Sequence, residues 1–551
     1  MTFMKASHRP QSQSRMDKQP APPPQTDVPS RSDRARASGA RAPHAEIELK
    51  LRASPAAIEQ IRKAPVIVQN ARSRGVVRRL DTVYYDTPDQ ALARQRGSLR
   101  VRRNGTRYVQ TLKLAVADRS PFTRQEWETA VDSPAPDLTR LPAEINAALA
   151  LTADELAPVF ATRIRRRAQR LKFRGAEVDI AFDEGTVEAG EQREPLTEIE
   201  LELKAGDIAA LFEVGMQLLD VAPLRIGTLS KADRGYALAF DAVPQVAKSE
   251  RSAIGPEHSV DDVIAIIMSA GQQHLLANQA IVEDGRDPEG VHQTRVALRR
   301  LRTACSLLRR EIPSPAFHAF AGEAKWLMQM LSPARDWDVF TTTTLARLQS
   351  ACDSEVDFDG LRRVAEPHRA ASYALLRKAL TDPRYTRFQL SLRRWTERRG
   401  WRSEVPSKAL GTLTQPASAL AVRVLARLQR KALKEGAHFT RLQPEARHDL
   451  RVTLKKLRYA AEFFLPVFAK DPSAKRWVAR LAKLQDALGH AQDSTVTRSL
   501  LGVAGQAELT PDLHRAAGAA IGWLARDQVA AAKNLRKRWR DFKATPCFWR
   551  E

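Results

Sequence analysis

Three features are scarce in this chain, and each scarcity excludes a class of protein. Only three of the 551 residues are cysteines (Cys305, Cys352 and Cys547), and their spacing fits neither a disulfide framework nor a zinc site. No apolar run approaches the roughly 18–20 residues of a membrane-spanning helix, and the N-terminus lacks an apolar signal segment. Aromatic residues make up 6%, and no base-reading motif is present. We therefore expect a cytoplasmic protein without a membrane partner, and these features disfavour a nucleic-acid partner.

Acidic residues are outnumbered by basic ones, and the imbalance is uneven along the chain. Lys and Arg number 89 against 64 Asp and Glu, a formal net charge of +25. Residues 1–44 contribute +5, residues 45–243 only +1, and residues 244–551 the remaining +19. The first segment is rich in Pro, Ser, Gln and Arg, which predicts a disordered basic tail. The expected later units are a nearly neutral domain at 45–243, a linker at 244–257, a basic domain at 258–542 and a C-terminal tail at 543–551.

Alternating polar and apolar residues recur across residues 45–243 and predict β-strands, each with one charged face. An open sheet with its polar face in water explains any one of these strands. The set is better explained by a closed barrel, because the charges of both signs would then gather inside around water, a metal ion and a polyanion. Helices at about 54–64, 143–150 and 206–220 are expected to cover the apolar outer face.

The residue types on these charged faces point to phosphate chemistry. Mg²⁺ and Mn²⁺ prefer carboxylate oxygens and often bridge to substrate phosphates. Arg and Lys side chains hold phosphate oxygens, and Arg does so with two parallel hydrogen bonds. This combination suits metal-assisted attack of water on a phosphoryl group.

The segment Glu46-Ile-Glu-Leu-Lys50 resembles the ExExK signature of the CYTH family, the triphosphate tunnel metalloenzymes. The resemblance continues through Tyr84-Tyr-Asp-Thr-Pro88 and Leu99-Arg-Val-Arg102 as far as Ser230-Lys-Ala-Asp-Arg-Gly-Tyr236. It implies an α+β, multidomain chain that starts with an eight-stranded antiparallel β tunnel with flanking helices.

The resemblance also implies roles for individual residues. The expected catalytic residues are Glu46, Glu48 and Lys50. The expected metal ligands are Glu46, Glu48, Asp183, Glu200 and Glu202, with Glu188 as a weaker candidate. The expected phosphate-binding residues are Arg100, Arg102, Lys113, Arg124, Arg163, Arg165, Lys204, Lys231 and Arg234. Within the run 162–167, alternation favours Arg163 and Arg165, although the sequence leaves the strand register open.

Residues 258–542 show helical periodicity and an internal repeat, in two copies at about 258–400 and 415–542. The sequence from Val291 to Arg302 reappears from Arg447 to Arg458, which predicts a duplicated helical bundle. Each copy carries a basic stripe at helical spacing, and facing stripes would line one cleft. The stripes comprise His292, Arg295, Arg299, Arg302, His448, Arg451, Lys455 and Arg458.

A basic stripe is most often a helix face exposed to solvent. A catalytic alternative is phosphoryl transfer through a phosphohistidine at His292. The paired motifs instead resemble the CHAD domain, which implies binding of inorganic polyphosphate.

The sequence thus predicts a metal-dependent inorganic triphosphatase that uses Mg²⁺ or Mn²⁺ and carries a domain that binds long-chain polyphosphate. Association with polyphosphate granules would follow from that binding. The alternatives are a non-catalytic polyphosphate scaffold or sensor, an enzyme that acts on thiamine triphosphate or ATP, and nucleic-acid binding through the basic domain.

Overall fold

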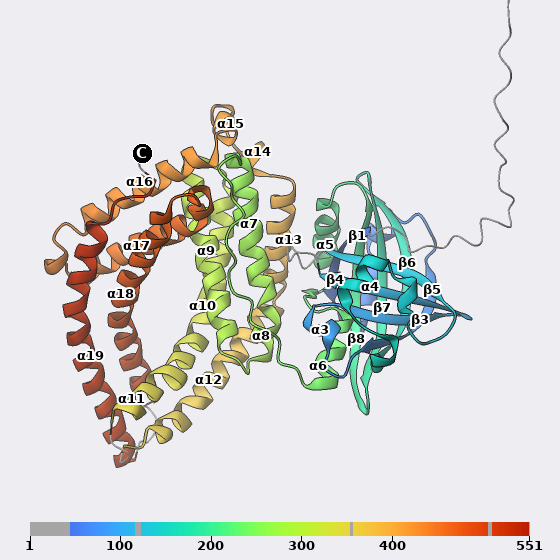
Figure 1. The fold of residues 1–551 in the computed structure, drawn as a ribbon, viewed down its shortest axis with the longest axis horizontal. Coiled ribbons are helices and arrows are strands. Elements are labelled where there is room, and N and C mark those ends of the chain that lie inside the picture. Colours follow the sequence, from blue (N-terminus) through green and yellow to red (C-terminus); the bar gives the residue numbers. More distant parts are fainter. Residues whose placement is uncertain (1–43, 116–122, 353–355, 505–509, 550–551) are drawn as a thin grey trace, which may run out of the picture.

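The computed structural model describes residues 44–115, 123–352, 356–504 and 510–549. Within these ranges the chain folds into a β-barrel followed by a helical domain, and the two lie side by side (Figure 1). The predicted fold class is confirmed: an antiparallel β tunnel with flanking helices precedes an all-α domain. The tail predicted at 1–44 falls outside the described residues except for its last position.

The barrel is a single antiparallel sheet that closes on itself. Its strands follow the order β5-β4-β3-β2-β6-β7-β8-β1, and β1 also pairs with β5. A two-residue strand, β9 (Arg225–Ile226), extends the sheet beside β1. The eight barrel strands are β1 (His44–Arg52), β2 (Val76–Asp86), β3 (Ser98–Asn104), β4 (Arg107–Ala115), β5 (Thr123–Val131), β6 (Ala157–Phe173), β7 (Ala176–Ala189) and β8 (Gln192–Ala205).

Helices cover the apolar outer face of the barrel, as the alternation predicts. Leu49 and Leu51 of β1 are fully buried against α1 (Pro55–Arg62), α2 (Pro65–Val68) and α5 (Ala209–Val221). On another side a smaller cluster joins β3, β4 and β5 to α4 (Ala143–Leu149). With the apolar positions facing these helices, the intervening charged positions face the barrel interior.

One further helix, α6 (Lys231–Phe240), closes an end of the barrel from within. Ser230 caps its N-terminus, and Ala232 and Tyr236 pack among interior side chains such as Phe160 and Ile164. A Cβ atom at Gly235 would lie 2.0 Å from the ring of Phe160, so only glycine permits this close approach. The helix therefore enters the barrel with Lys231, its first residue, deepest toward the charged cavity.

The helical domain contains two sets of packed helices. The first comprises α7 (Val260–Ala277), α8 (Gln279–Asp284), α9 (Glu289–Glu311), α10 (Ala316–Asp338), a π-helical turn at Val339–Thr344, α11 (Leu345–Ala351), α12 (Phe358–Thr381) and α13 (Pro383–Glu397). Two short helices follow, α14 (Trp401–Glu404) and α15 (Ser407–Leu413). The second set comprises α16 (Ala417–Glu435), α17 (Pro444–Phe464), α18 (Pro472–Ala504) and α19 (Pro511–Lys543). The repeated sequence forms α9 in the first set and α17 in the second.

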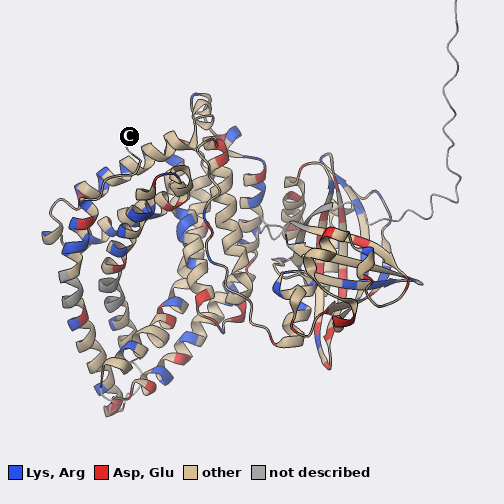
Figure 2. Cartoon of the chain, in the orientation of Figure 1, with Lys and Arg blue, Asp and Glu red and all other residues tan. Residues whose placement is uncertain are grey.

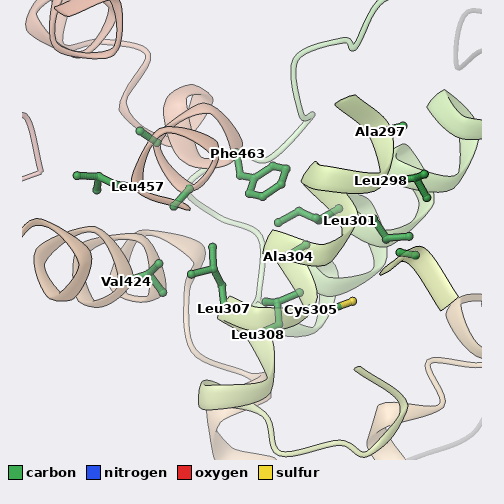
Figure 3. Close-up of a cluster of buried hydrophobic side chains, with 14 of the residues drawn as sticks. Ala297, Leu298, Leu301, Ala304, Cys305, Leu307, Leu308, Val424, Leu457 and Phe463 are labelled. Atoms are coloured by element: carbon green, nitrogen blue, oxygen red, sulfur yellow. The ribbon is translucent and has the colours of Figure 1, made fainter. Parts of the chain in front are cut away.

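The apolar face predicted for the first repeat lies in the core of this domain. Leu298, Leu301 and Cys305 of α9 are at most 1% exposed. They belong to a continuous cluster that also takes Leu457 and Phe463 from α17 (Figure 3). The two repeats therefore share one core, and α9 lies beside α17.

The two domains are joined by direct packing as well as by the chain. Helix α13 lies against α5, and Leu390 of α13 enters the barrel's outer core. The buried Thr386 hydroxyl donates to the Leu224 carbonyl at 2.8 Å. Within the described ranges, no helix combines the length and apolar character needed to cross a membrane.

The C-terminal segment differs from the predicted tail. Phe548 and Trp549 are 6% and 3% exposed and pack edge-on against the fully buried Trp477 of α18. The aromatic rings bury enough apolar surface to hold this segment on the helical core, so it belongs to that domain.

Candidate functional site

The barrel interior holds a polar cavity of about 560 Å³. Its walls carry eight Lys or Arg and five Glu side chains, which come from seven elements of the barrel. The basic residues are Lys50, Arg100, Arg102, Lys113, Arg166, Arg170, Lys204 and Lys231, and the acidic ones are Glu48, Glu126, Glu128, Glu200 and Glu202. The interior is therefore charged with both signs, as a closed barrel predicts.

Lys231 lies at the deepest charged point of the cavity and joins three carboxylates. Its ammonium is 2.8 Å from Asp183 and 2.6 Å from Glu200, and it also donates to Glu198. These carboxylate oxygens lie within 4.8 Å of one another. Burial lowers the pKa of Lys231, but the three carboxylates outweigh it and raise that pKa well above its ordinary value. This acidic cluster therefore already surrounds a cation, the ammonium of Lys231.

Arg166 of β6 completes the charged floor of the cavity. Its Nη2 is 2.5 Å from Asp183, and it also donates to Glu200. Burial raises the pKa of Glu200, but Lys231, Arg166 and Lys50 outweigh it and hold that pKa well below its usual range. Glu200 is thus ionised throughout the neutral range and can offer an oxygen to the cavity.

The opposite wall is cationic. Arg100 and Lys113 lie on neighbouring strands, 3.8 and 3.1 Å from Glu126. Arg102 donates to the hydroxyl of Thr82 at 3.3 Å. The pKa of Arg102 falls to about 10, first because Arg100 repels its charge and then because it is buried. A bound anion would relieve this repulsion, so the wall is arranged for an anionic ligand.

The donor set on β1 and β8 fits a hard divalent cation. Glu48 lies directly opposite Glu202 in the sheet, and both carboxylates face the cavity. Glu200 lies two residues away on the same face of β8, opposite Lys50. Glu48 accepts from Lys50 at 2.6 Å, which keeps its oxygens inside the cavity. Three carboxylates with room for water are the ligands that Mg²⁺ and Mn²⁺ prefer.

Most of the predicted tunnel residues meet in this cavity. Those that line it are Glu48, Lys50, Arg100, Arg102, Lys113, Glu200, Glu202, Lys204 and Lys231. Asp183 lies directly behind the floor, fully buried. The side chains of Glu46 and Arg124 lie outside the described residues, although their backbones pair with each other across β1 and β5.

Three predicted phosphate-binding residues lie away from the cavity. Arg163 is exposed and bonds to Glu188, which is thereby also outside the cavity. Arg165 is exposed too. Arg234 is buried against Glu194 and faces a second cavity at the junction with α8.

The inward face of β6 is one residue out of step with the arginines that alternation favours. Within 162–167, alternation favours Arg163 and Arg165 as the cations of the charged face, with the register left open. Ile164 instead faces inward, where it packs with α6 at the closed end of the barrel. Arg166 and Arg170 share its face and are the residues of this strand that reach the cavity as cations.

Several cavity residues escaped the sequence analysis. Arg166 follows from the observed register of β6. Thr82 lies two residues before the motif Tyr84-Tyr-Asp-Thr-Pro88, and Tyr84 is the first residue of that motif. Glu198 does not line the cavity, but it lies on the acidic face of β8 and pairs with Lys231. Tyr84 stacks on Phe160 with ring centroids 4.4 Å apart. Its place on the inward face of β2 was predictable only once that strand's register was known.

The helical domain holds a second charged cavity, of about 890 Å³, between α9 and α17. Arg299 donates to the Tyr459 hydroxyl at 3.2 Å, and Arg300 to Glu462 at 2.8 Å, so the two repeated helices contact each other directly. Six Lys or Arg side chains line the cavity against three acidic ones. Figure 2 shows Lys and Arg gathered where α9 approaches α17, whereas the barrel strands carry both signs. We call this space the helical cleft.

The two basic stripes contribute unequally to the helical cleft. His292, Arg299, Arg451, Lys455 and Arg458 line it. The other three stripe residues are Arg295, which donates to Ser332, and the exposed Arg302 and His448. Of the two histidines predicted to bind polyphosphate, His292 therefore lies in the cleft, whereas His448 is exposed outside it. The sequence did not single out Arg300 as a cleft residue, because its position on α9 lies between the basic stripe and the apolar face.

His292 is held neutral by its surroundings. Burial is the largest cause, followed by the charge of Arg335, and together they lower the pKa of His292 to about 4. Its imidazole can therefore take up a proton when a bound anion offsets the neighbouring cations.

Fold and sites together define a two-domain protein, a charged β tunnel joined to a duplicated helical bundle. Residues 44–236 match the family model of the CYTH domain, and residues 266–502 match that of the CHAD domain. The chain is therefore a fusion of a CYTH domain and a CHAD domain.

Some related proteins match only one part of the chain, and others match most of it. An inorganic triphosphatase of Haemophilus influenzae is 33% identical over 165 residues, which are 29% of this chain and 46% of that protein. An uncharacterised protein of Mycobacterium tuberculosis is 26% identical over 442 residues, 77% of this chain and 81% of that protein. The crystal structure of the CHAD domain from Ricinus communis shares 27% identity, covers 53% of this chain and 96% of its own, and has a TM-score of 0.46.

Proposed function

We propose that the protein is a metal-dependent inorganic triphosphatase, which cleaves triphosphate to diphosphate and phosphate in the barrel cavity. One observation carries the proposal: cations from five strands and α6 converge on the cavity, and three carboxylates on β1 and β8 face it. The CYTH match and the triphosphatase relative support the same reaction class. A cavity of about 560 Å³ accommodates a triphosphate with its water.

The chain's own residues supply positioning and charge. Arg100, Arg102 and Lys113 would hold the phosphate oxygens from one wall, and Arg166 and Lys231 from the floor. Phosphoryl transfer passes through a loose transition state with charge on the peripheral oxygens, so fixed cations lower the barrier more than proton transfer does. Water would attack the terminal phosphorus, and diphosphate would leave.

Glu48, Glu200 and Glu202 would hold the divalent metal, and Glu46, two residues before Glu48 in the sequence, is a fourth proposed ligand. Bound Mg²⁺ or Mn²⁺ would neutralise phosphate charge and polarise the attacked phosphoryl group. Asp183 is assigned instead to holding Lys231 and Arg166, because both cations contact it directly.

An inorganic substrate fits the cavity better than thiamine triphosphate or ATP. Tyr84 is the aromatic residue among those that line the cavity, and its ring already stacks on Phe160. The described walls thus offer no open aromatic face to a heterocycle. A panel of triphosphate, thiamine triphosphate, ATP and long-chain polyphosphate, each with Mg²⁺ or Mn²⁺, tests this choice by phosphate release.

Replacing Glu48 by Gln tests the proposed reaction. The substitution keeps the shape but removes the charge that would hold the metal and anchor Lys50. We expect kcat/KM for triphosphate to fall by at least about 10²-fold. Glu188→Gln is the matched control, since Glu188 bonds to Arg163 outside the cavity. Undiminished hydrolysis by Glu48→Gln would overturn the assignment, and absence of turnover in the unaltered protein would favour a polyphosphate scaffold.

The proposal extends to the helical cleft, which we assign to long-chain polyphosphate. Its lining is mainly cationic, spans both repeats and includes one aromatic side chain, Tyr459. A flexible polyanion without bases needs cations rather than stacking surfaces. Such binding would bring the protein to cytoplasmic polyphosphate granules, and competition by duplex DNA at equal phosphate concentration is the test against nucleic acid.

Polyphosphate binding is expected to strengthen as the pH falls. The pKa of His292 is about 4 in the free protein, and an adjacent polyanion raises it toward the ordinary 6.5. At pH values between these two pKa values, polyphosphate binding is accompanied by uptake of a proton on His292. The affinity for polyphosphate therefore rises about tenfold between roughly pH 7.5 and 5.5. Calorimetric titration at both pH values measures the change.

The two histidines provide the control for this experiment. His292→Gln is expected to remove most of the pH dependence, whereas His448→Gln leaves it in place because His448 is exposed outside the cleft. Equal pH dependence in all three proteins would place the polyanion away from His292.

A further inference from the structure

Another cavity, of about 480 Å³, lies beneath the segment that connects the two domains. Residues 247–253 form its roof, and α7 and α9 form its floor. Arg96, from the turn before β3, reaches it from the barrel domain. The barrel reaction does not use this space, which we call the junction pocket. It adjoins the helical cleft, and the two linings share Ser249, Glu250, Arg251 and Arg300.

The floor of the junction pocket is mainly apolar and made largely of small side chains, although Ser269, Gln273 and His274 of α7 also line it. Ile266, Ala270, Gly271 and Ala277 come from α7, and Leu301 from α9. A Cβ atom at Gly271 would lie 3.3 Å from Leu301, so the glycine lets α7 approach α9 closely. Phe463 of α17 closes the far wall, with its ring toward Leu301 of α9 (Figure 3), and Ala297 of α9 also lines the pocket. Such a surface suits an aliphatic or aromatic group.

The rim of the pocket is cationic. Arg96, Lys248 and Arg251 are exposed, and none of them forms an ion pair with any residue in the described part of the chain. Arg300 forms the wall toward the helical cleft, where it pairs with Glu462 and lies 4.8 Å over the Phe463 ring. Glu250 is the acidic residue of the lining. Excess positive charge at the mouth of an apolar pocket favours a ligand with an anionic end.

Contacts hold the roof segment in place at both of its ends, so the cavity is a fixed feature of the fold. At one end the backbone of Ala247 is held on both sides by the buried Asn278 side chain, with N to Oδ1 at 3.1 Å and Nδ2 to O at 2.9 Å. His274 also bonds to the Ala247 carbonyl at 3.0 Å. At the other end Ser252 and Ile254 are buried. Residues 248–251 therefore arch over the floor between fixed points.

Arg96 occupies a backbone position that favours glycine. Its φ is +55°, in the left-handed region that L side chains rarely adopt. An arginine there carries a conformational cost that a glycine would avoid. Its guanidinium at the pocket rim gives a reason for the arginine side chain at this position.

We infer that the junction pocket binds a small amphipathic anion, with an apolar body on the α7–α9 floor and one phosphate or carboxylate group at the Arg96–Lys248–Arg251 rim. The inference is independent of the proposed triphosphatase, because no residue of the barrel cavity takes part. A ligand there would contact the barrel domain, the connecting segment and the helical domain at once.

Calorimetric titration of the full chain with octyl phosphate and octanoate tests the inference. We expect one saturable site for the preferred head group, and binding at least about tenfold weaker for octanol and for methyl phosphate. Octanol lacks the anionic end and methyl phosphate lacks the apolar body. The stronger of the two octyl ligands identifies the head group. Absence of a saturable site for both overturns the inference, as does equal binding of octanol or methyl phosphate.

Two helix-surface substitutions locate the site. Ala270 is exposed on α7 at the pocket floor, so Ala270→Trp fills the cavity without disturbing the core. We expect this variant to lose octyl-ligand binding at least about tenfold. Ala319→Trp, at an exposed position of α10, is the matched control and should bind as the unaltered protein does. Arg96→Gln should weaken the octyl anion but not octanol. Unchanged binding by Ala270→Trp would place the ligand elsewhere and overturn the assignment.

Discussion

Arg166→Met is expected to lower kcat/KM for triphosphate by at least about 10²-fold, whereas Arg165→Met changes it by no more than about twofold. The two residues are sequence neighbours on β6, but their side chains lie on opposite faces of the sheet. Arg166 reaches the cavity and bonds to Asp183 and Glu200, while Arg165 is exposed outside. Both variants lose the same charge from the same strand. Comparing their activities therefore measures the effect of the side chain that faces the cavity.

Steady-state phosphate release with Mg²⁺ or Mn²⁺ measures the difference, and thermal unfolding of both variants separates catalysis from folding. Because Arg166 also neutralises two buried carboxylates, some loss of stability is expected in Arg166→Met. Arg166→Lys keeps the charge and should recover stability more fully than activity, because lysine cannot form the paired hydrogen bonds of a guanidinium. A larger effect from Arg165→Met would show that the odd-numbered arginines bind the substrate.

The barrel was predictable from sequence wherever its two faces differ in polarity. On β1 the alternation of Glu48 and Lys50 with Leu49 and Leu51 sets the inward and outward faces, and the structure keeps that assignment. The same logic failed on β6, because the interior is not polar along its whole length. Ile164 faces inward against α6, and an isolated strand sequence does not reveal where a helix will fill a barrel.

Contacts between distant segments explain the other differences. The pairing of β2 with β6 shifts between Tyr84 and Tyr85, and such an irregularity has no signal in either strand alone. Arg234 follows Lys231 by three residues on α6, yet it bonds to Glu194 at the domain junction. His448 holds the same position in the second repeat as His292 does in the first. The connecting residues 249–251 line the cleft together with His292, whereas His448 is exposed outside that cleft. Two equal sequence copies therefore acquire unequal surroundings.

Lys231→Met is expected to have the largest effect on stability, with a loss of about 3–5 kcal/mol in the free energy of unfolding near pH 8. The side chain is 9% exposed and contacts Asp183, Glu198 and Glu200. Without the ammonium, Arg166 still bonds to Asp183 and Glu200, and Lys50 lies 3.9 Å from Glu200. Glu198 would then have no ion-pair partner among the described residues. Lys204→Met is the control: Lys204 also lines the cavity, but it is 34% exposed and pairs with one carboxylate, so about 1 kcal/mol or less is expected.

The pH dependence of that loss distinguishes the electrostatic cause from lost packing. In the unaltered protein the pKa of Glu200 lies well below its usual range, so its contribution is fully present above the unfolded pKa near 4.5 and is lost only as the pH falls further. In Lys231→Met, mutual repulsion raises the pKa of at least one carboxylate above its unfolded value. The folded variant then binds a proton that the unfolded chain does not, and its stability increases as the pH falls from about 8 to 5.5. Urea unfolding at both pH values measures the two slopes. A constant difference between the variant and the unaltered protein would attribute the loss to packing, and would show that the ammonium of Lys231 is not what keeps this acidic cluster ionised.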